Sequence, residues 1–177
     1  MDGSQTQRSA AEKFALFFLI LGTIAWLGGI NIRGVLSNHL LVMGTLESEP
    51  NLNPIVEREV FRLINYSSIV TILGYTTVFI AGIVFLRSTR FTMKENGWLM
   101  MSALLFYIFS PAELYTSFLD GRMVSLELWG NVEIATLREL LIKRIAALKG
   151  LPYIALLCYY TIIGLVIWQP LKKKTVG

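Results

Sequence analysis

Four long apolar blocks constrain what this chain can fold into more than any other feature of its sequence. They cover residues 14–32, 66–86, 97–118 and 151–168, and polar segments separate them. A helix needs about 20 largely apolar residues to cross the roughly 30 Å hydrocarbon core of a bilayer. The pattern therefore predicts an all-α integral membrane protein with four transmembrane helices, whose first partner is the lipid bilayer.

The composition agrees with this prediction. Only 16% of the 177 residues are charged and 54% are hydrophobic, whereas about a quarter of the residues of a soluble domain are charged. We expect a polar N-terminal tail over residues 1–13, a transmembrane domain over 14–168 and a basic C-terminal tail over 169–177. A signal peptide is the competing interpretation of the first block. However, the block exceeds the usual 7–15 apolar residues and no small-residue cleavage site follows it.

The two long connections, residues 33–65 and 119–150, are predicted to carry amphipathic helices on one side of the membrane. In the first connection, Asn53 is a helix N-cap and Pro54 begins the helix, which then runs into the second transmembrane block. In the second connection, Asn131 is the expected N-cap, with Glu133 in the first turn. One apolar face of that helix comprises Ile134, Leu137, Leu141, Ile145 and Leu148. Such a face either lies in the membrane interface or packs on a partner.

An even number of spans places both termini on one side of the membrane. The basic residues divide equally between the two sides, so their count alone does not orient the chain. On the side of the termini they lie in short segments next to the spans, whereas on the other side acidic residues balance them. We therefore expect both termini in the cytoplasm, and the protein in a plasma or inner membrane.

Glu113 is the first candidate for chemistry, because it follows Ser110 and Pro111 near the end of the third block. A carboxylate at membrane depth often marks an ion or proton path, and helices broken by proline expose backbone groups to ligands. The alternative is that the third span ends near Pro111, which would leave Glu113 in the wet interface.

Asn31 and Arg33 end the first block and are the next candidates. Arg33 could pair with Glu113 or Asp120, or it could extend its head group to the interface as many membrane arginines do. The candidates for an ion or substrate path are thus Glu113, Arg33, Asn31 and Asp120.

Small residues in the first two blocks predict close helix packing, because they allow two backbones to approach. The candidates are Gly22, Ala25, Gly28, Gly29, Gly74 and Gly82.

Several classes of function lack their sequence patterns. The single cysteine, Cys158, excludes an intrachain disulfide and a cysteine-based metal cluster. The single histidine, His39, cannot by itself form a histidine-rich metal or haem site. The sequence contains no P-loop, dinucleotide-binding, zinc-protease or serine-hydrolase motif. We expect no catalytic residue, metal, cofactor or nucleic-acid partner, and an enzyme is disfavoured.

Three functions remain open. The favoured one is a small accessory or structural subunit that holds other membrane subunits through its helices and its two connections. The alternative is a small homo-oligomeric transporter or channel that uses Glu113 and Arg33. The third is a membrane enzyme acting on a lipid or quinone, with Arg33, His39, Glu113 and Asp120 as its polar site.

Overall fold

The computed structural model describes residues 9–42, 45–89, 93–130 and 132–172, and most of these residues are helical. The elements are α1 (Ala10–Ser37), α2 (Pro54–Ser88), α3 (Gly97–Trp129), α4 (Ile134–Ala146), the short 3₁₀ segment η1 (Ala147–Gly150) and α5 (Leu151–Trp168). Much of the predicted N-terminal tail, the end of the basic C-terminal tail and the predicted N-cap Asn131 lie outside the described residues.

The protein is an all-α integral membrane protein, as predicted. Among the described residues, four helical segments are long and apolar enough to cross a membrane: α1, α2, α3, and α4 together with α5. With its 35 residues, α2 is about 52 Å long at 1.5 Å per residue. That exceeds the roughly 30 Å of a hydrocarbon core. Its first turns carry Glu57, Arg58, Glu59 and Arg62, which places them outside the hydrocarbon.

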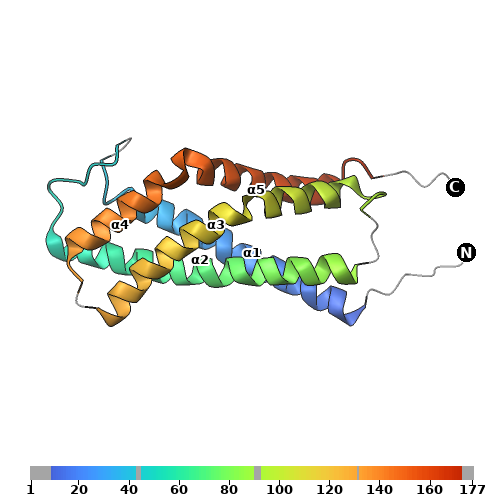
Figure 1. Cartoon of the computed structure of the whole chain (residues 1–177), viewed down its shortest axis with the longest axis horizontal. Coiled ribbons are helices and arrows are strands. Elements are labelled where there is room, and N and C mark those ends of the chain that lie inside the picture. The colour runs from blue at the N-terminus through green and yellow to red at the C-terminus, as the bar shows by residue number, and fades with distance from the viewer. Residues whose placement is uncertain (1–8, 43–44, 90–92, 131, 173–177) are drawn as a thin grey trace, which may run out of the picture.

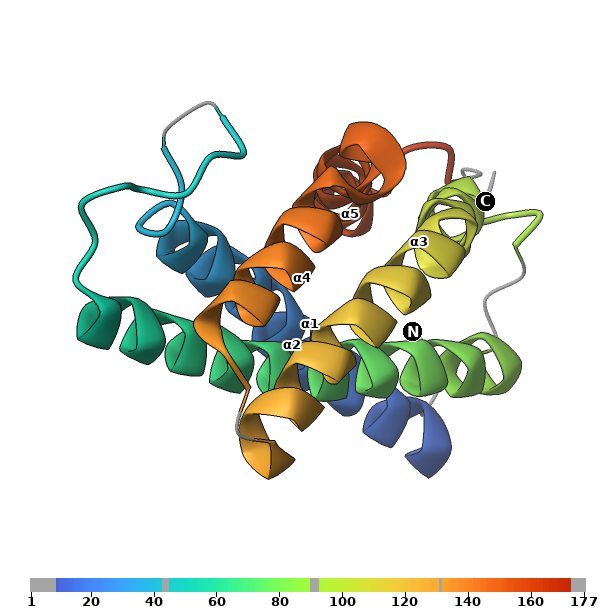
Figure 2. The same ribbon diagram turned by 60° about the vertical axis from the view of Figure 1, so that its left-hand side comes forward.

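The four long helices run along the long axis of the molecule (Figure 1). The start of α1, the end of α2, the start of α3 and the end of α5 lie together, and we call this the termini end. The opposite end, which we call the cap end, contains α4 and the first turns of α2. Figure 2 shows α1 and α2 crossing as one pair, with α3 passing in front of α2 and the α4–α5 arm beside α3.

The α1–α2 pair is the closest helix contact in the fold. A Cβ atom added to Gly74 would lie 2.6 Å from the backbone nitrogen of Trp26, and one added to Gly22 would lie 3.0 Å from the Gly74 carbonyl oxygen. Two turns nearer the cap end, the Ser67 hydroxyl donates a hydrogen bond of 2.8 Å to the carbonyl oxygen of Gly29. Small residues thus allow the two backbones to touch, and a polar contact follows from their proximity.

Not every candidate packing residue lies in that interface. Gly29 does lie in it, since a Cβ on this residue would lie 3.2 Å from the Ser67 carbonyl oxygen of α2. Gly82 faces α3 instead, where a Cβ would meet the Tyr107 hydroxyl at 2.9 Å. A Cβ at Gly28 would meet nothing within 4 Å. Ala25 is half-buried.

Two hydrophobic cores stabilise the structure. The membrane core joins α1, α2, α3 and α5 through Trp26, Leu27, Tyr75, Val78, Phe106, Ala155 and Tyr159. The cap core joins α2, α3 and α4 to the turn after α1 through Leu40, Phe61, Ile64, Met123, Leu137, Leu140 and Leu141. Leu137 and Leu141, from the predicted apolar face of the second connection, therefore pack within the chain itself.

The structure corrects two expectations about helix ends. The third helix does not end near Pro111, because α3 continues through this proline to Trp129. Ala112, Thr116 and Leu119 are buried beyond it, and this packing offsets the hydrogen bond that proline cannot make. Likewise, α4 begins at Ile134, so Glu133 occupies the N-cap position instead of the first turn.

The expected start of α2 is confirmed. The Asn53 side chain accepts a hydrogen bond of 2.9 Å from the backbone N–H of Ile55, and Pro54 is the first helical residue. No break separates this start from the membrane-spanning part, so cap and membrane share one continuous helix.

Gly74→Leu should destabilise the fold, because the new side chain would collide with the backbone of Trp26. Overpacking of this kind costs about 1–3 kcal/mol. The control is Gly28→Leu, whose side chain would enter open space. Chemical unfolding of both variants in detergent micelles measures the difference in the free energy of unfolding. Equal stability of the two variants would contradict the close α1–α2 contact.

Candidate functional site

A buried cluster of charged side chains lies between the two cores, at the point where α1 ends against α3. Arg33 of α1 is only 4% exposed. Its guanidinium forms an ion pair and hydrogen bond with the Asp120 carboxylate of α3 and approaches the Ser68 hydroxyl of α2 at 3.5 Å. Of the two partners considered from the sequence, Arg33 is therefore paired with Asp120.

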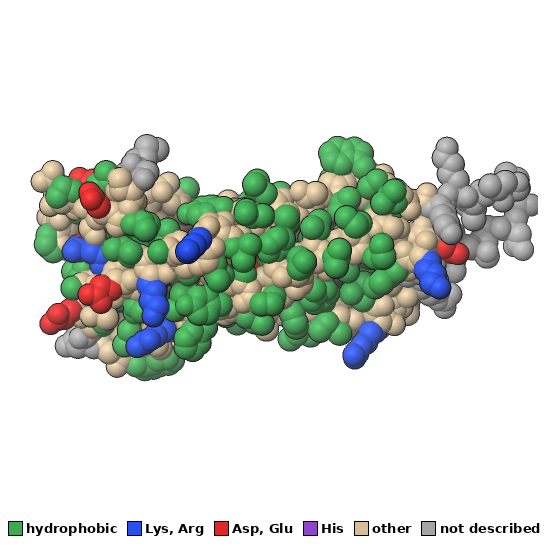
Figure 3. Space-filling view, turned by 45° about the horizontal axis from the view of Figure 1, so that its top comes forward, with side chains coloured by type: hydrophobic (Ala, Val, Ile, Leu, Met, Phe, Trp, Pro, Cys, Tyr) green, Lys and Arg blue, Asp and Glu red, His purple; other side chains and the backbone are tan. Residues whose placement is uncertain are grey.

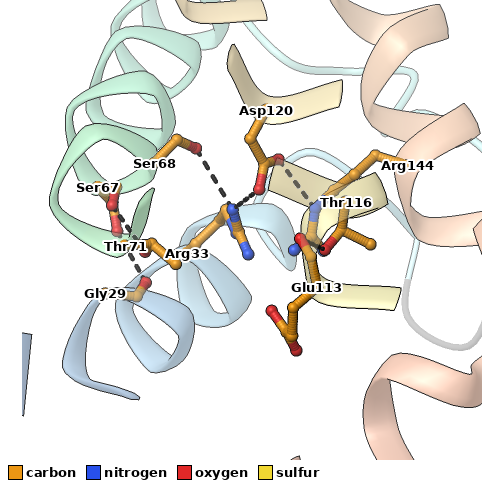
Figure 4. A network of polar contacts seen from close by, with 9 residues as sticks. All are labelled: Gly29, Arg33, Ser67, Ser68, Thr71, Glu113, Thr116, Asp120 and Arg144. Carbon is orange, nitrogen blue, oxygen red and sulfur yellow. Dashed lines mark hydrogen bonds and ion pairs between the residues drawn. The ribbon is translucent and has the colours of Figure 1, made fainter. Parts of the chain in front are cut away.

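Asp120 also binds a second arginine. Arg144 of α4 donates from Nε to the other Asp120 carboxylate oxygen at 2.9 Å. One carboxylate, 3% exposed, thus accepts from two guanidinium groups on different helices (Figure 4). A buried ion pair is costly unless it is well hydrogen-bonded, and here both oxygens of the acid are used.

Glu113 belongs to the same region but not to the same network. It lies seven residues before Asp120, on the same face of α3, and is 8% exposed. Its carboxylate makes no ion pair with a described residue, although Arg144, Arg33 and Tyr159 lie within electrostatic reach. Figure 4 shows this carboxylate pointing away from the Arg33–Asp120 pair. Its backbone carbonyl accepts a hydrogen bond of 3.1 Å from the Thr116 hydroxyl.

The charges of this cluster balance formally, with two arginines against two acids. Arg33, Arg144 and Asp120 hold one another in place. Displacing Asp120 would leave both arginines without their carboxylate, and displacing either arginine would leave Asp120 with one cation instead of two. Glu113 is the member whose protonation could change without breaking an ion pair. The arrangement can thus fix three helices rigidly and, at Glu113, hold or release a proton.

The other two candidates lie apart from the cluster. Asn31 faces α5, where its side-chain amide donates a hydrogen bond of 2.7 Å to the Tyr160 hydroxyl. The same amide donates a hydrogen bond of 2.9 Å to the carbonyl oxygen of Leu27 within α1. His39 is exposed in the turn that follows α1. The structure therefore does not join His39 to Arg33, Glu113 and Asp120.

A second set of ion pairs holds the cap together. Arg138 of α4 binds the Glu57 carboxylate of α2 at 2.6 Å. Arg58 of α2 lies 3.3 Å from Glu127 of α3 and donates to the Val132 carbonyl at 2.8 Å. These contacts tie α4 and the loop before it to α2 and α3.

Sequence reasoning did not identify the two arginines of α4 as members of these sites. Their partners are distant in sequence, since Arg144 lies 24 residues from Asp120 and Arg138 lies 81 residues from Glu57. One signal was present: the seven-residue spacing of Glu113 and Asp120 places two acids on one helix face, which calls for basic partners nearby.

No group of three or more His, Cys, Asp and Glu side chains that could hold a metal ion occurs within the described ranges. Comparison with known proteins gives no match, since no family model, no curated protein and no solved structure is significantly similar to this chain. The class of function must therefore come from the geometry.

Arg33→Met should destabilise the protein strongly, because Asp120 would lose one of its two cationic partners inside the bundle. Removing one member of a buried ion pair costs about 3–5 kcal/mol. The matched control is Arg62→Met, because Arg62 is 54% exposed in its pair with Glu59 and an exposed pair contributes about 1 kcal/mol or less. Unfolding in detergent compares the two variants. Similar losses would show that the Arg33–Asp120 pair does not hold the helices together.

Proposed function

We propose that the protein is a small accessory or structural subunit of a multi-subunit membrane complex, and that it holds partner subunits through its outward helix faces. The observation that carries this proposal is the small burial of α5. In the most apolar window of the α4–α5 segment, 11% of the residues are buried, against 28% to 33% in the other three segments. A membrane helix that its own chain covers so little has most of its surface available to another helix.

The outward face of α5 has a shape that suits a neighbouring helix. A groove there is lined by Leu157, Tyr160, Thr161, Gly164, Leu165, Trp168 and Pro170. Small and hydroxyl-bearing residues such as Gly164 and Thr161 are common where membrane helices pack against one another. The buried charges support the same proposal, because Arg33, Asp120 and Arg144 are used within the chain as cross-links.

A second candidate function is a small homo-oligomeric transporter or channel, and one observation favours it. Glu113 is buried in the spanning part of α3 without an ion pair among the described residues, and such carboxylates often serve ion or proton paths. Arg33 supports this function less, because Asp120 already engages it. A lipid- or quinone-modifying enzyme has the least support, since His39 lies away from the other polar residues.

The distribution of charge supports an orientation with both termini in the cytoplasm of a plasma or inner membrane. At the termini end, Lys13, Arg87, Lys94 and Lys172 are exposed. At the cap end, five arginines are engaged by acids: Arg33, Arg58, Arg62, Arg138 and Arg144. Arg122, Lys143 and Lys149 are the remaining basic residues there. Basic residues close to span ends favour the cytoplasmic side.

Purification from the native membrane in mild detergent should yield the chain with other membrane subunits in fixed proportion, as identified by mass spectrometry and native size. Gly164→Leu should release them, because the larger side chain fills the groove on α5. Gly28→Leu, the same change at an open site on α1, should not. A homo-oligomer without partners would overturn the proposal. Loss of transport in Glu113→Gln, with unchanged assembly, would then establish the second candidate.

Orientation can be measured by cysteine labelling in a Cys158→Ala background. Glu59→Cys places a thiol at the cap end, where Glu59 is 60% exposed, and Lys94→Cys places one at the termini end. An impermeant maleimide should label Glu59→Cys in intact cells, but Lys94→Cys only after permeabilisation. The reverse pattern would contradict the proposed orientation.

A further inference from the structure

Helices α1 and α5 meet near the middle of the bundle and leave a gap between them toward the termini end. They are joined by the rings of Trp26 and Tyr159, whose centroids are 4.5 Å apart, and by the hydrogen bond from Asn31 to Tyr160. Beyond this contact lies a cavity of about 400 Å³, with walls from α1, α2, α3 and α5. Trp26 and Tyr159 line its inner end.

The lining of this cavity is uncharged and almost wholly apolar. Its walls include Leu19 and Thr23 of α1, Phe85 of α2, Ala103 of α3, and Ile163 and Val166 of α5. No charged side chain lines it. The part of a ligand that enters must therefore be hydrocarbon, because a polar or charged group there would lose its hydration without a partner.

The dimensions of the cavity match one lipid chain. Along α1 it extends from Leu16 to Leu27, a distance of about 16 Å at 1.5 Å per residue. The hydrocarbon thickness of one leaflet is about 15 Å, half of the bilayer core. Dividing the volume of about 400 Å³ by this length gives a mean cross-section of about 25 Å². That area holds a single extended chain and is too narrow for a helix.

The surroundings of the cavity favour a lipid from the membrane itself. The exposed rims of α1 and α5 are apolar, with Ile20, Ile24, Ile163 and Ile167 among their exposed side chains. The view in Figure 3 shows hydrophobic side chains over the middle of the molecule and charged ones toward its two ends. If this cavity were empty, the side chains of its walls would lack dispersion contacts on one side. The acyl chains of the surrounding lipids can supply these contacts.

The termini end adds a preference for the headgroup. Leu86, Trp98 and Ile167 line the cavity near this end. Around it lie the exposed basic residues Lys13, Arg87, Lys94 and Lys172. Basic side chains near a membrane surface attract anionic lipids. An anionic phosphate group would thus lie close to these cations while its chain occupies the cavity.

We propose that this cavity binds one acyl chain of an anionic phospholipid from the leaflet at the termini end, so that the lipid fills the gap between α1 and α5. The proposal is independent of the accessory role, because it concerns a face inside the bundle and not the outward groove on α5.

The test is native mass spectrometry of the full chain, purified in mild detergent and exchanged into vesicles that contain phosphatidylglycerol and phosphatidylcholine in equal amounts. The wild-type chain should retain one phospholipid and favour phosphatidylglycerol by roughly fivefold for each basic side chain that contacts the headgroup. Arg87→Gln with Lys172→Gln should reduce this preference.

Thr23→Phe should lower the retained fraction by roughly tenfold, because the ring occupies the volume of several methylene groups of the chain. Thr76→Phe is the matched control, since Thr76 is exposed on α2 and does not line the cavity. Ala103→Phe narrows the cavity from the opposite wall and serves if Thr23→Phe does not fold.

Lipid retention that survives both cavity-filling variants would overturn the proposal. So would retention of detergent alone, of an uncharged lipid or quinone, or of phosphatidylcholine and phosphatidylglycerol equally. None of these results depends on whether other subunits co-purify, so failure here and failure of the accessory role remain distinguishable.

Discussion

The Asp120 carboxylate is the point on which the arrangement of the helices depends. It receives Arg33 from α1 and Arg144 from α4, while its own helix, α3, packs on both α2 and α5. Without this acid, two guanidinium groups would be buried between the cores with Glu113 as the nearby acid. The buried charges thus fix the relative positions of the helices, because an ion pair between two helices sets how far one is shifted along the axis of the other.

The position of the charge cluster also explains the shape of the membrane part. The cluster near the cap and the Trp26–Tyr159 contact near the middle of the bundle hold α1 against α3 and α5. Toward the termini end, α1 instead follows α2, through Gly22 and Gly74. Since α5 packs chiefly on α3, it separates from α1 beyond the Trp26–Tyr159 contact, where the cavity begins. The cavity therefore lies where α1 follows α2 and α5 follows α3, so that α1 and α5 are no longer in contact.

Much of this fold could be predicted from apolar blocks and caps, because both are local signals. The four spans, the Asn53 cap and the long continuous α2 follow from patterns within a few turns of chain. The continuation of α3 past Pro111 could not, because burial against other helices outweighs the local cost of proline. The charge cluster was foreseen only in part. Arg33 and Asp120 stood out as charges near span ends, whereas Arg144 belongs to the site through tertiary packing alone.

The separation into two cores has a thermodynamic consequence. Helices α2 and α3 are longer than a hydrocarbon layer, and the cap core, in which Phe61 and Leu137 are fully buried, lies on the parts that extend beyond it. Folding of the cap core therefore excludes water. Its stability then includes the hydrophobic effect, which weakens on cooling. The membrane core around Trp26 excludes lipid instead, and helix association there depends on packing and polar contacts. The two halves of the continuous helix α2 are thus stabilised against different solvents, water at the cap and lipid in the membrane. The stability of each half therefore depends on temperature in a different way.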